Sequence, residues 1–127
     1  MKSLYSNLAI FFLVFIANSC LLVHSFNVSI SNELRATLDT TCIVDNADGG
    51  RIGIKARHSY DFPLSSYANC TLDCRPLGLN GTYFLYDRNR DSKRCANVTC
   101  EWHVKNDGLF LNLQGQLVLQ FPWMKKH

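Results

Sequence analysis

The chain has 127 residues, with 13 Lys and Arg against 10 Asp and Glu, so its formal net charge is +3 at pH 7. This length accommodates one domain and excludes a multidomain enzyme. The small positive charge falls well short of the dense basic surface that nucleic-acid binding requires, so nucleic acid is not an expected partner.

The N-terminal segment has the pattern of a secretory signal peptide, because a short positive start precedes an apolar run from Leu8 to Ala17. Small residues favour cleavage after Ser25, with cleavage after Ser19 as the alternative. We therefore expect residues 1–25 to be removed and residues 26–127 to form one exported domain without a membrane span. An uncleaved N-terminal anchor is the competing interpretation.

The rest of the chain is dominated by short runs in which apolar and polar residues alternate, which is the period of a half-buried β-strand. In chain order, the predicted strands span Phe26–Ser31, Thr40–Val44, Arg51–Ala56, Ser59–Leu64, Ala68–Cys74, Thr82–Asp87, Val98–Lys105, Leu109–Leu113 and Leu117–Phe121. Asn32–Leu38 is the only candidate helix.

Several strands have a face that the alternation assigns to the core. The residues expected to point inward are Ile52, Ile54, Ala56, Tyr60, Phe62, Leu64, Ala68, Cys70, Leu72, Cys74, Cys100, Trp102 and Val104. Turn residues such as Asp107 and Gly108 separate the strands. Eight or nine short strands with this spacing predict an all-β fold, a small antiparallel β-sandwich stabilised by disulfides.

Cysteine counting gives an odd number in the exported part. Cleavage after Ser25 leaves Cys42, Cys70, Cys74, Cys95 and Cys100, so one thiol would be free or intermolecular. Cleavage after Ser19 would retain Cys20 and restore an even number. A zinc site is disfavoured, because no His pair lies at ligand spacing near these cysteines. We therefore expect disulfides and no metal.

Acceptors for N-linked glycosylation (Asn-x-Ser/Thr) begin at Asn27, Asn69, Asn80 and Asn97. A glycosylated Asn must face water. Alternation sends Asn69 outward while Cys70 points to the core, so acceptor and strand pattern agree at this site.

Catalytic patterns are lacking in the sequence. His58 falls in a turn and His103 on the outer face of a predicted strand, and neither has a nucleophile motif beside it. The segment from Asp45 to Gly50 fails the calcium-loop pattern, because position three is Ala47 and no closing Glu follows. We therefore expect no enzyme activity and no cofactor, and the function that remains is binding.

The most polar stretch is Asp87–Arg94, in which Arg88, Arg90, Lys93 and Arg94 alternate with acidic residues. It is interpreted as a solvated loop between two strands or, alternatively, as a partner-binding loop.

The residues from Cys95 to Leu111 have the form C-x4-C-x-W-x-V-x2-D-G-L-F-L, and an aromatic, Trp123, closes the chain. This pattern resembles the C-terminal part of the plant self-incompatibility protein family, the stigma S-protein homologues. The similarity extends from about Val28 to Trp123. It maps the family's four cysteines to Cys42, Cys70, Cys95 and Cys100 and makes Cys74 the extra thiol, with the connectivity left open.

The resemblance implies a small secreted β-sandwich that acts as an extracellular ligand, as in pollen rejection by the pistil. We expect a monomer that binds a cell-surface receptor or another extracellular protein through the loops 45–51, 76–81 and 87–94. Arg88, Arg90 and Lys93 are the candidate contacts. The alternative is a secreted defence protein that inhibits a hydrolase or binds carbohydrate on Tyr83, Phe84 and Tyr86.

Overall fold

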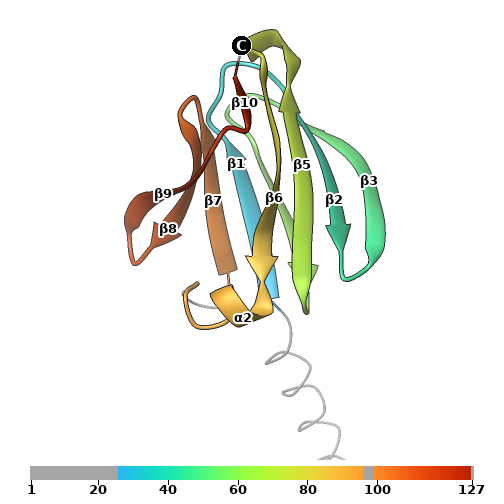
Figure 1. The fold of residues 1–127 in the computed structure, drawn as a ribbon, viewed down its shortest axis with the longest axis vertical. Coiled ribbons are helices and arrows are strands. Elements are labelled where there is room, and N and C mark those ends of the chain that lie inside the picture. The colour runs from blue at the N-terminus through green and yellow to red at the C-terminus, as the bar shows by residue number, and fades with distance from the viewer. Residues whose placement is uncertain (1–25, 96–98, 127) are drawn as a thin grey trace, which may run out of the picture.

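The computed structural model describes residues 26–95 and 99–126, which form two five-stranded sheets packed face to face (Figure 1). One sheet has the strand order β4-β1-β7-β8-β9 and the other β10-β6-β5-β2-β3. The strands are β1 (Phe26–Asn32), β2 (Leu38–Val44), β3 (Ala47–Ile54), β4 (Ser59–Leu64), β5 (Tyr67–Cys74), β6 (Leu79–Asp87), β7 (Thr99–Lys105), β8 (Gly108–Leu113), β9 (Gln116–Pro122) and β10 (Lys125–Lys126). Two short helices accompany them in the described ranges, η1 (Arg75–Leu77) and α2 (Arg88–Asp91). The predicted all-β sandwich is confirmed.

The topology corrects the prediction in two respects. The described residues contain ten strands, because the two-residue strand β10 pairs with β6 beyond the last predicted strand. The sheets are also not purely antiparallel, since β1 pairs with β7 in parallel, with Ile30 opposite Trp102. Alternation along a single strand carries no information about the direction of its neighbour, so the sequence alone could not reveal this pairing.

The core follows the predicted alternation most closely in the central strands. In β5 the side chains of Ala68, Cys70, Leu72 and Cys74 are fully buried. Trp102, in strand β7 of the opposite sheet, is also fully buried. The aromatic ring of Trp102 therefore lies in the middle of the sandwich, and its inward orientation is confirmed.

The predicted helix at Asn32–Leu38 is wrong, because Asn32 ends β1, Leu38 begins β2, and the five residues that connect them are not helical. The side chain of Asn32 is buried and organises the connection. Its amide donates to the carbonyls of Ala36 at 2.9 Å and Ile54 at 2.8 Å, and its carbonyl oxygen accepts from the Leu34 N–H at 2.9 Å. Asn side chains favour such local backbone bonds over a helix.

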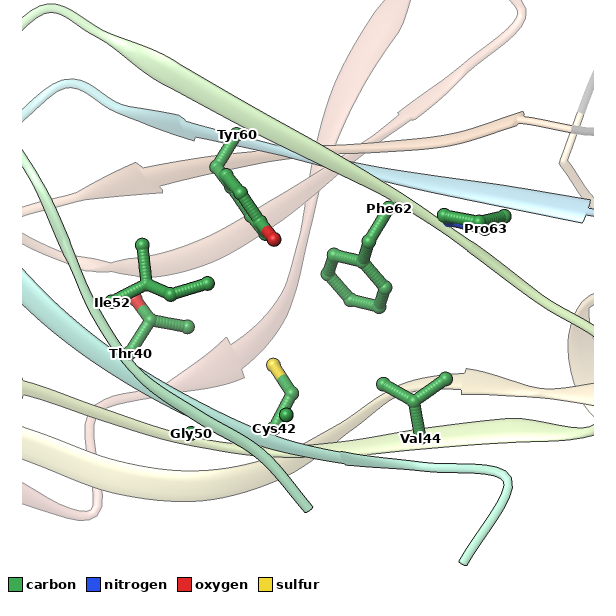
Figure 2. A pocket seen from close by; sticks show the side chains of 9 residues that line it. Thr40, Cys42, Val44, Gly50, Ile52, Tyr60, Phe62 and Pro63 are labelled. Atoms are coloured by element: carbon green, nitrogen blue, oxygen red, sulfur yellow. The ribbon is translucent and has the colours of Figure 1, made fainter. Parts of the chain in front are cut away.

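The side of the sandwich formed by β3 and β4 is more open than predicted. Ile54, Phe62 and Leu64 are buried, but Ile52 is only half-buried, Ala56 lies in a turn, and Tyr60 is 36% exposed. These strands are the edges of their sheets, and a cleft of about 170 Å³ lies between them. Figure 2 shows Tyr60 and Phe62 directed across the cleft toward the Cys42 sulfur and Val44.

The predicted signal peptide, residues 1–25, and the acceptor Asn97 lie outside the described residues. In the ranges 26–95 and 99–126 no helix is long and apolar enough to cross a membrane.

Candidate interaction site

The basic stretch predicted as a loop contains the one-turn helix α2. The helix begins because the Asp87 carboxylate accepts from the backbone N–H groups of Asn89 at 2.9 Å and Arg90 at 3.4 Å, which an N-cap residue is suited to do. At its other end the Ser92 N–H donates to the carbonyl of Arg88 at 3.2 Å. The side chains of α2 are thus presented on ordered backbone.

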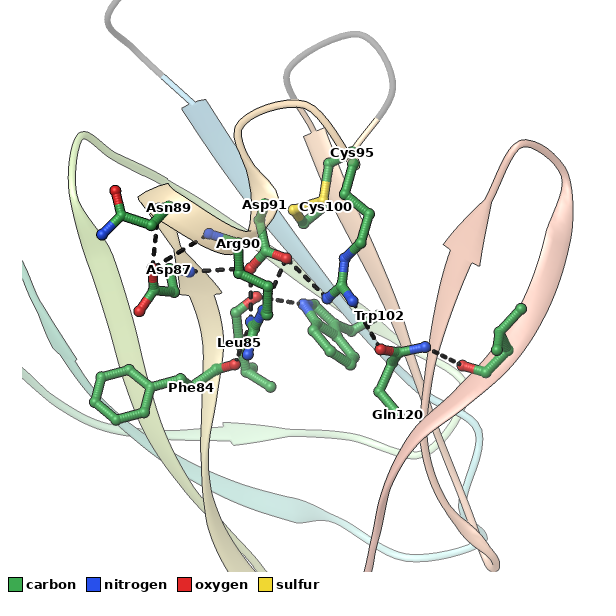
Figure 3. Close-up of polar contacts among 12 residues, drawn as sticks. Phe84, Leu85, Asp87, Asn89, Arg90, Asp91, Cys95, Cys100, Trp102 and Gln120 are labelled. Atoms are coloured by element: carbon green, nitrogen blue, oxygen red, sulfur yellow. Dashed lines mark hydrogen bonds and ion pairs between the residues drawn. A yellow bond between two sulfur atoms is a disulfide. The ribbon is translucent and has the colours of Figure 1, made fainter.

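A buried carboxylate, Asp91, holds this segment against the end of β6 (Figure 3). Its oxygens accept from the Asp87 N–H at 3.0 Å and from the Arg90 Nε and Nη2 at 2.9 and 2.6 Å, and the Arg94 Nη2 lies 2.7 Å away in an ion pair. Two guanidinium groups therefore compensate one charge that has only 1% of its surface exposed.

Each of these arginines makes one further hydrogen bond within the chain. Arg90 Nη2 donates to the carbonyl of Phe84 at 2.7 Å, and its guanidinium stands 5.7 Å from the ring centre of Phe121. Arg94 Nη1 donates to Gln120 Oε1 at 2.9 Å. Of the three basic residues predicted as contacts, Arg90 is thus engaged within the chain, whereas Arg88 and Lys93 are exposed.

The strand before α2 contains a β-bulge that positions its neighbours. Register along β5 and β6 shifts at Leu85, so that Leu85 and the adjacent Tyr86 are both fully buried. Tyr83 is also buried, and only Phe84 is exposed, at 45%. The predicted sugar platform of Tyr83, Phe84 and Tyr86 is therefore not displayed, because two of its rings belong to the core.

The turn between β2 and β3 lies at the same end of the molecule. Asp45 and Asn46 both have positive φ, 50° and 70°, as a tight hairpin requires. The Asp45 carboxylate reaches the next turn and accepts from the N–H groups of Ser65 at 2.8 Å, Ser66 at 2.7 Å and Tyr67 at 3.0 Å. Partial burial alone would raise the pKa of Asp45, but these bonds outweigh it and hold that pKa below its ordinary value.

These elements form one continuous surface, which we call the α2 end: Asp45, Asn46, Ser65, Ser66 and the segment 88–93. The Arg88 N–H donates to the Ser66 carbonyl at 3.0 Å, which joins α2 to the turn that Asp45 caps. The predicted loops 45–51 and 87–94 therefore lie together. Most of the first is strand, because β3 begins at Ala47.

The third predicted loop, 76–81, lies elsewhere. Strands β5 and β6 pair from Tyr67 and Asp87 at one end to Cys74 and Leu79 at the other, so the connection through η1 is at the end of the sandwich opposite α2 (Figure 1). The three predicted loops therefore do not form one contact surface.

An apolar patch adjoins the α2 end on the outer face of its sheet. Ile43 and Phe84, 44% and 45% exposed, flank Asn69 in the strand register. A shallow depression includes all three and is bordered by Arg88 and Asn89. Exposed apolar residues bordered by Arg resemble the anatomy of protein interfaces. The sequence named Phe84 only together with Tyr83 and Tyr86, and alternation could not separate the exposed ring from the buried ones, because the bulge at Leu85 breaks the period.

The five cysteines in the described ranges form two disulfides and leave one thiol. Cys42 bridges to Cys70 in the neighbouring strand, and Cys95 bridges to Cys100 beside the base of α2. The pairing that the sequence left open is thereby determined. Cys74 carries a free thiol that is fully buried, and burial raises the pKa of this thiol.

The acceptor asparagines lie at several places on the outer surface. Asn27 is exposed, whereas Asn69 and Asn80 are half-buried.

His103, predicted on an outer face, contacts the carboxylates of Glu33 and Glu101 at 2.6 and 2.8 Å. Residues 26–95 and 99–126 hold no group of three or more His, Cys, Asp or Glu side chains arranged to bind a metal ion.

The fold and this surface define a class of protein, a small disulfide-bonded β-sandwich with an ordered, basic loop end. A family model described as "Plant self-incompatibility protein S1" matches residues 27–123. The chain belongs to this family. No curated protein and no solved structure matches it.

Proposed function

We propose that the chain is exported and acts as an extracellular signalling ligand of the self-incompatibility type, which binds a cell-surface receptor through its α2 end. The single observation that carries this proposal is the attachment of α2 by buried Asp91, which leaves Arg88 and Lys93 exposed on ordered backbone. Pre-ordered charged side chains lose less conformational entropy on binding than those of a mobile loop.

The proposal assigns different roles to the basic residues. Arg88 and Lys93 are assigned to receptor contact, with Phe84 and Ile43 supplying apolar area beside them. Arg90 becomes a positioning residue, because its guanidinium binds Asp91 and the Phe84 carbonyl. The family membership supports a signalling role, and two disulfides suit the oxidising environment outside the cell.

Glycosylation belongs to the same proposal. We infer that exported protein carries glycan at Asn27, the most accessible of the described acceptors, and that Asn69, Asn80 and Asn97 are further candidates. Intact mass before and after enzymatic deglycosylation tests this assignment. An unchanged mass in material secreted from plant cells would contradict it.

The experiment that tests the function uses labelled, secreted protein on intact plant cells. Saturable binding that unlabelled protein competes and that protease treatment of the cells abolishes is the expected result. Binding that survives protease but is lost after glycosidase treatment would instead favour the carbohydrate-binding defence protein. No saturable binding to any reproductive or vegetative tissue would overturn the proposal.

A further inference from the structure

The strand β9 forms an unprotected edge of its sheet. Within the described part of the chain it pairs only with β8, and no residue from Gln116 to Pro122 carries a charge. Three consecutive apolar side chains lie in its centre, and Leu117, Val118 and Leu119 are 38%, 40% and 45% exposed. An edge of this kind is a template for pairing with a further strand.

The other edges of the two sheets are protected. Strand β4 contains Asp61 and Pro63, and β3 contains Asp48 and Arg51. The two lysines of β10 cover the start of β6, and farther along β6 the carbonyls of Phe84 and Leu85 accept from Arg90 and Trp102. Charges and proline are the usual means by which edge strands avoid association. In β9 the only such residue is Pro122, at its end, and a bulge at Gln120 leaves the four residues from Gln116 to Leu119 as the regular, uncharged part of the edge. The contrast singles out β9 among the four edges.

The first five residues of β9 also read the same in both directions, as Gln116-Leu117-Val118-Leu119-Gln120. When two copies of such a strand meet antiparallel about Val118, Gln is opposite Gln, Leu opposite Leu and Val opposite Val. A two-fold interface requires self-complementary surfaces of this kind. We propose that β9 is the dimer interface of the protein, and that it pairs with β9 of a second copy in a register centred on Val118.

The backbone of β9 suits this register from Gln116 to Leu119, where its pairing with β8 is regular, and the bulge at Gln120 lies at the end of the palindrome. The turn before it consists of two residues, Gln114 and Gly115, both with positive φ, which makes Leu113 and Gln116 a hydrogen-bonded pair. Because such pairs alternate with non-hydrogen-bonded ones, Leu117 and Leu119 direct their N–H and C=O groups away from β8. Each Leu117 then exchanges both bonds with Leu119 of the second copy.

Both faces of the joined edge gain apolar contacts. Leu117 and Leu119 lie on the outer face, opposite Asn112 and Phe110, and Val118 lies on the inner face opposite buried Leu111. A foreign strand would satisfy the backbone equally well, but the palindrome favours a second copy. Antiparallel pairing would point the two α2 ends in opposite directions. The monomer expected from the sequence would then be the form that the protein takes at low concentration.

Disulfide trapping of secreted full-length protein tests the register. Val118→Cys places two cysteines at the two-fold axis, where Cα atoms of a non-hydrogen-bonded pair are about 4.5 Å apart, within disulfide reach. Gln116→Cys places them four residues apart along the pairing, about 14 Å, beyond that reach. We expect a covalent dimer as the main product for Val118→Cys and at least tenfold less for Gln116→Cys.

Sedimentation of the otherwise unchanged chain provides a second measurement. We expect reversible dimerisation that Val118→Lys abolishes and that Ile43→Lys, at an equally exposed apolar site on the other sheet, preserves. Either of two trapping results would overturn the proposal: equal trapping of both cysteine variants, or no trapping of Val118→Cys in a protein that stays monomeric at millimolar concentration. Either of two sedimentation results would also overturn it: dimers that persist in Val118→Lys, or dimers lost equally in both lysine variants.

Discussion

Trp102 in one sheet donates its indole N–H to the carbonyl oxygen of Leu85 in the other, across 2.7 Å in the buried centre of the sandwich. Leu85 is free to accept because the β-bulge takes it out of the regular ladder between β5 and β6. One aromatic residue thus fills the core and satisfies a buried carbonyl.

This contact gives a graded prediction for Trp102. Trp102→Phe keeps most of the ring but leaves the Leu85 carbonyl unpaired, so we expect a loss of about 1–3 kcal/mol in the free energy of unfolding. Trp102→Ala adds a cavity and should cost about 3–5 kcal/mol or more. Urea unfolding measures the free energy of unfolding of both variants. A Trp102→Phe variant as stable as the unaltered protein would contradict the assigned hydrogen bond.

The buried carboxylate of Asp91 gives a second prediction. Asp91→Asn removes the charge that two guanidinium groups share, and breaking a buried ion pair from one side costs about 3–5 kcal/mol. Asp61→Asn, at an exposed position in β4, is the matched control and should change stability by less than about 0.5 kcal/mol. Similar unfolding midpoints for the two variants would show that Asp91 does not anchor α2.

Asp45 should make the stability of the fold depend on pH. Because the folded pKa of Asp45 lies below its unfolded value, its contribution is complete above the unfolded pKa and is lost as the pH falls through the folded pKa. After allowance for its partial exposure we expect about 1 kcal/mol. Asp45→Asn should lose this amount of stability at pH 7, and its free energy of unfolding should fall less steeply below about pH 4. An unchanged pH profile would contradict the capping role.

The cysteines should differ in their effect on stability. Loop-closure entropy assigns about 3.5 kcal/mol to Cys42–Cys70, whose residues are 28 apart in sequence, and about 2 kcal/mol to Cys95–Cys100, which are 5 apart. We therefore expect Cys42→Ser to be more damaging than Cys95→Ser, and Cys74→Ala to cost only about 1 kcal/mol. Secretion yield and thermal unfolding rank the three variants. A Cys74 variant as damaging as Cys42→Ser would indicate a different pairing.

Alternation predicts the buried side chains correctly in strands that have one buried face and regular pairing with their neighbours. The alternation in β5 and β7 placed Cys70, Cys74 and Trp102 in the core, as found. Tyr60 has the same pattern, but its strand is a sheet edge beside a cleft, and periodicity does not distinguish an edge from a centre. Whether a strand is covered depends on contacts distant in sequence.

The candidate site was predictable in composition and less so in detail. The stretch 87–94 is recognisable by its charges, but the different roles of Arg88 and Arg90 follow from the folded backbone, which turns Arg90 toward Asp91 and toward the Phe121 ring of β9. The spacing of Asp91 and Arg94, three residues apart, was the only local indication of that ion pair. The exposed edge at β9 depends on strand order, which alternation does not encode.

The central claim, that the α2 end contacts a receptor, is tested most directly by charge reversal in a binding assay on intact cells. Arg88→Glu with Lys93→Glu changes two exposed cations at that end, and Lys55→Glu with Lys125→Glu makes the same change in net charge at exposed positions toward the opposite end. We expect the first pair to weaken binding at least tenfold, with unchanged circular dichroism and thermal unfolding, and the second pair to bind like the unaltered protein. Equal affinities for the two doubly reversed proteins would contradict the claim.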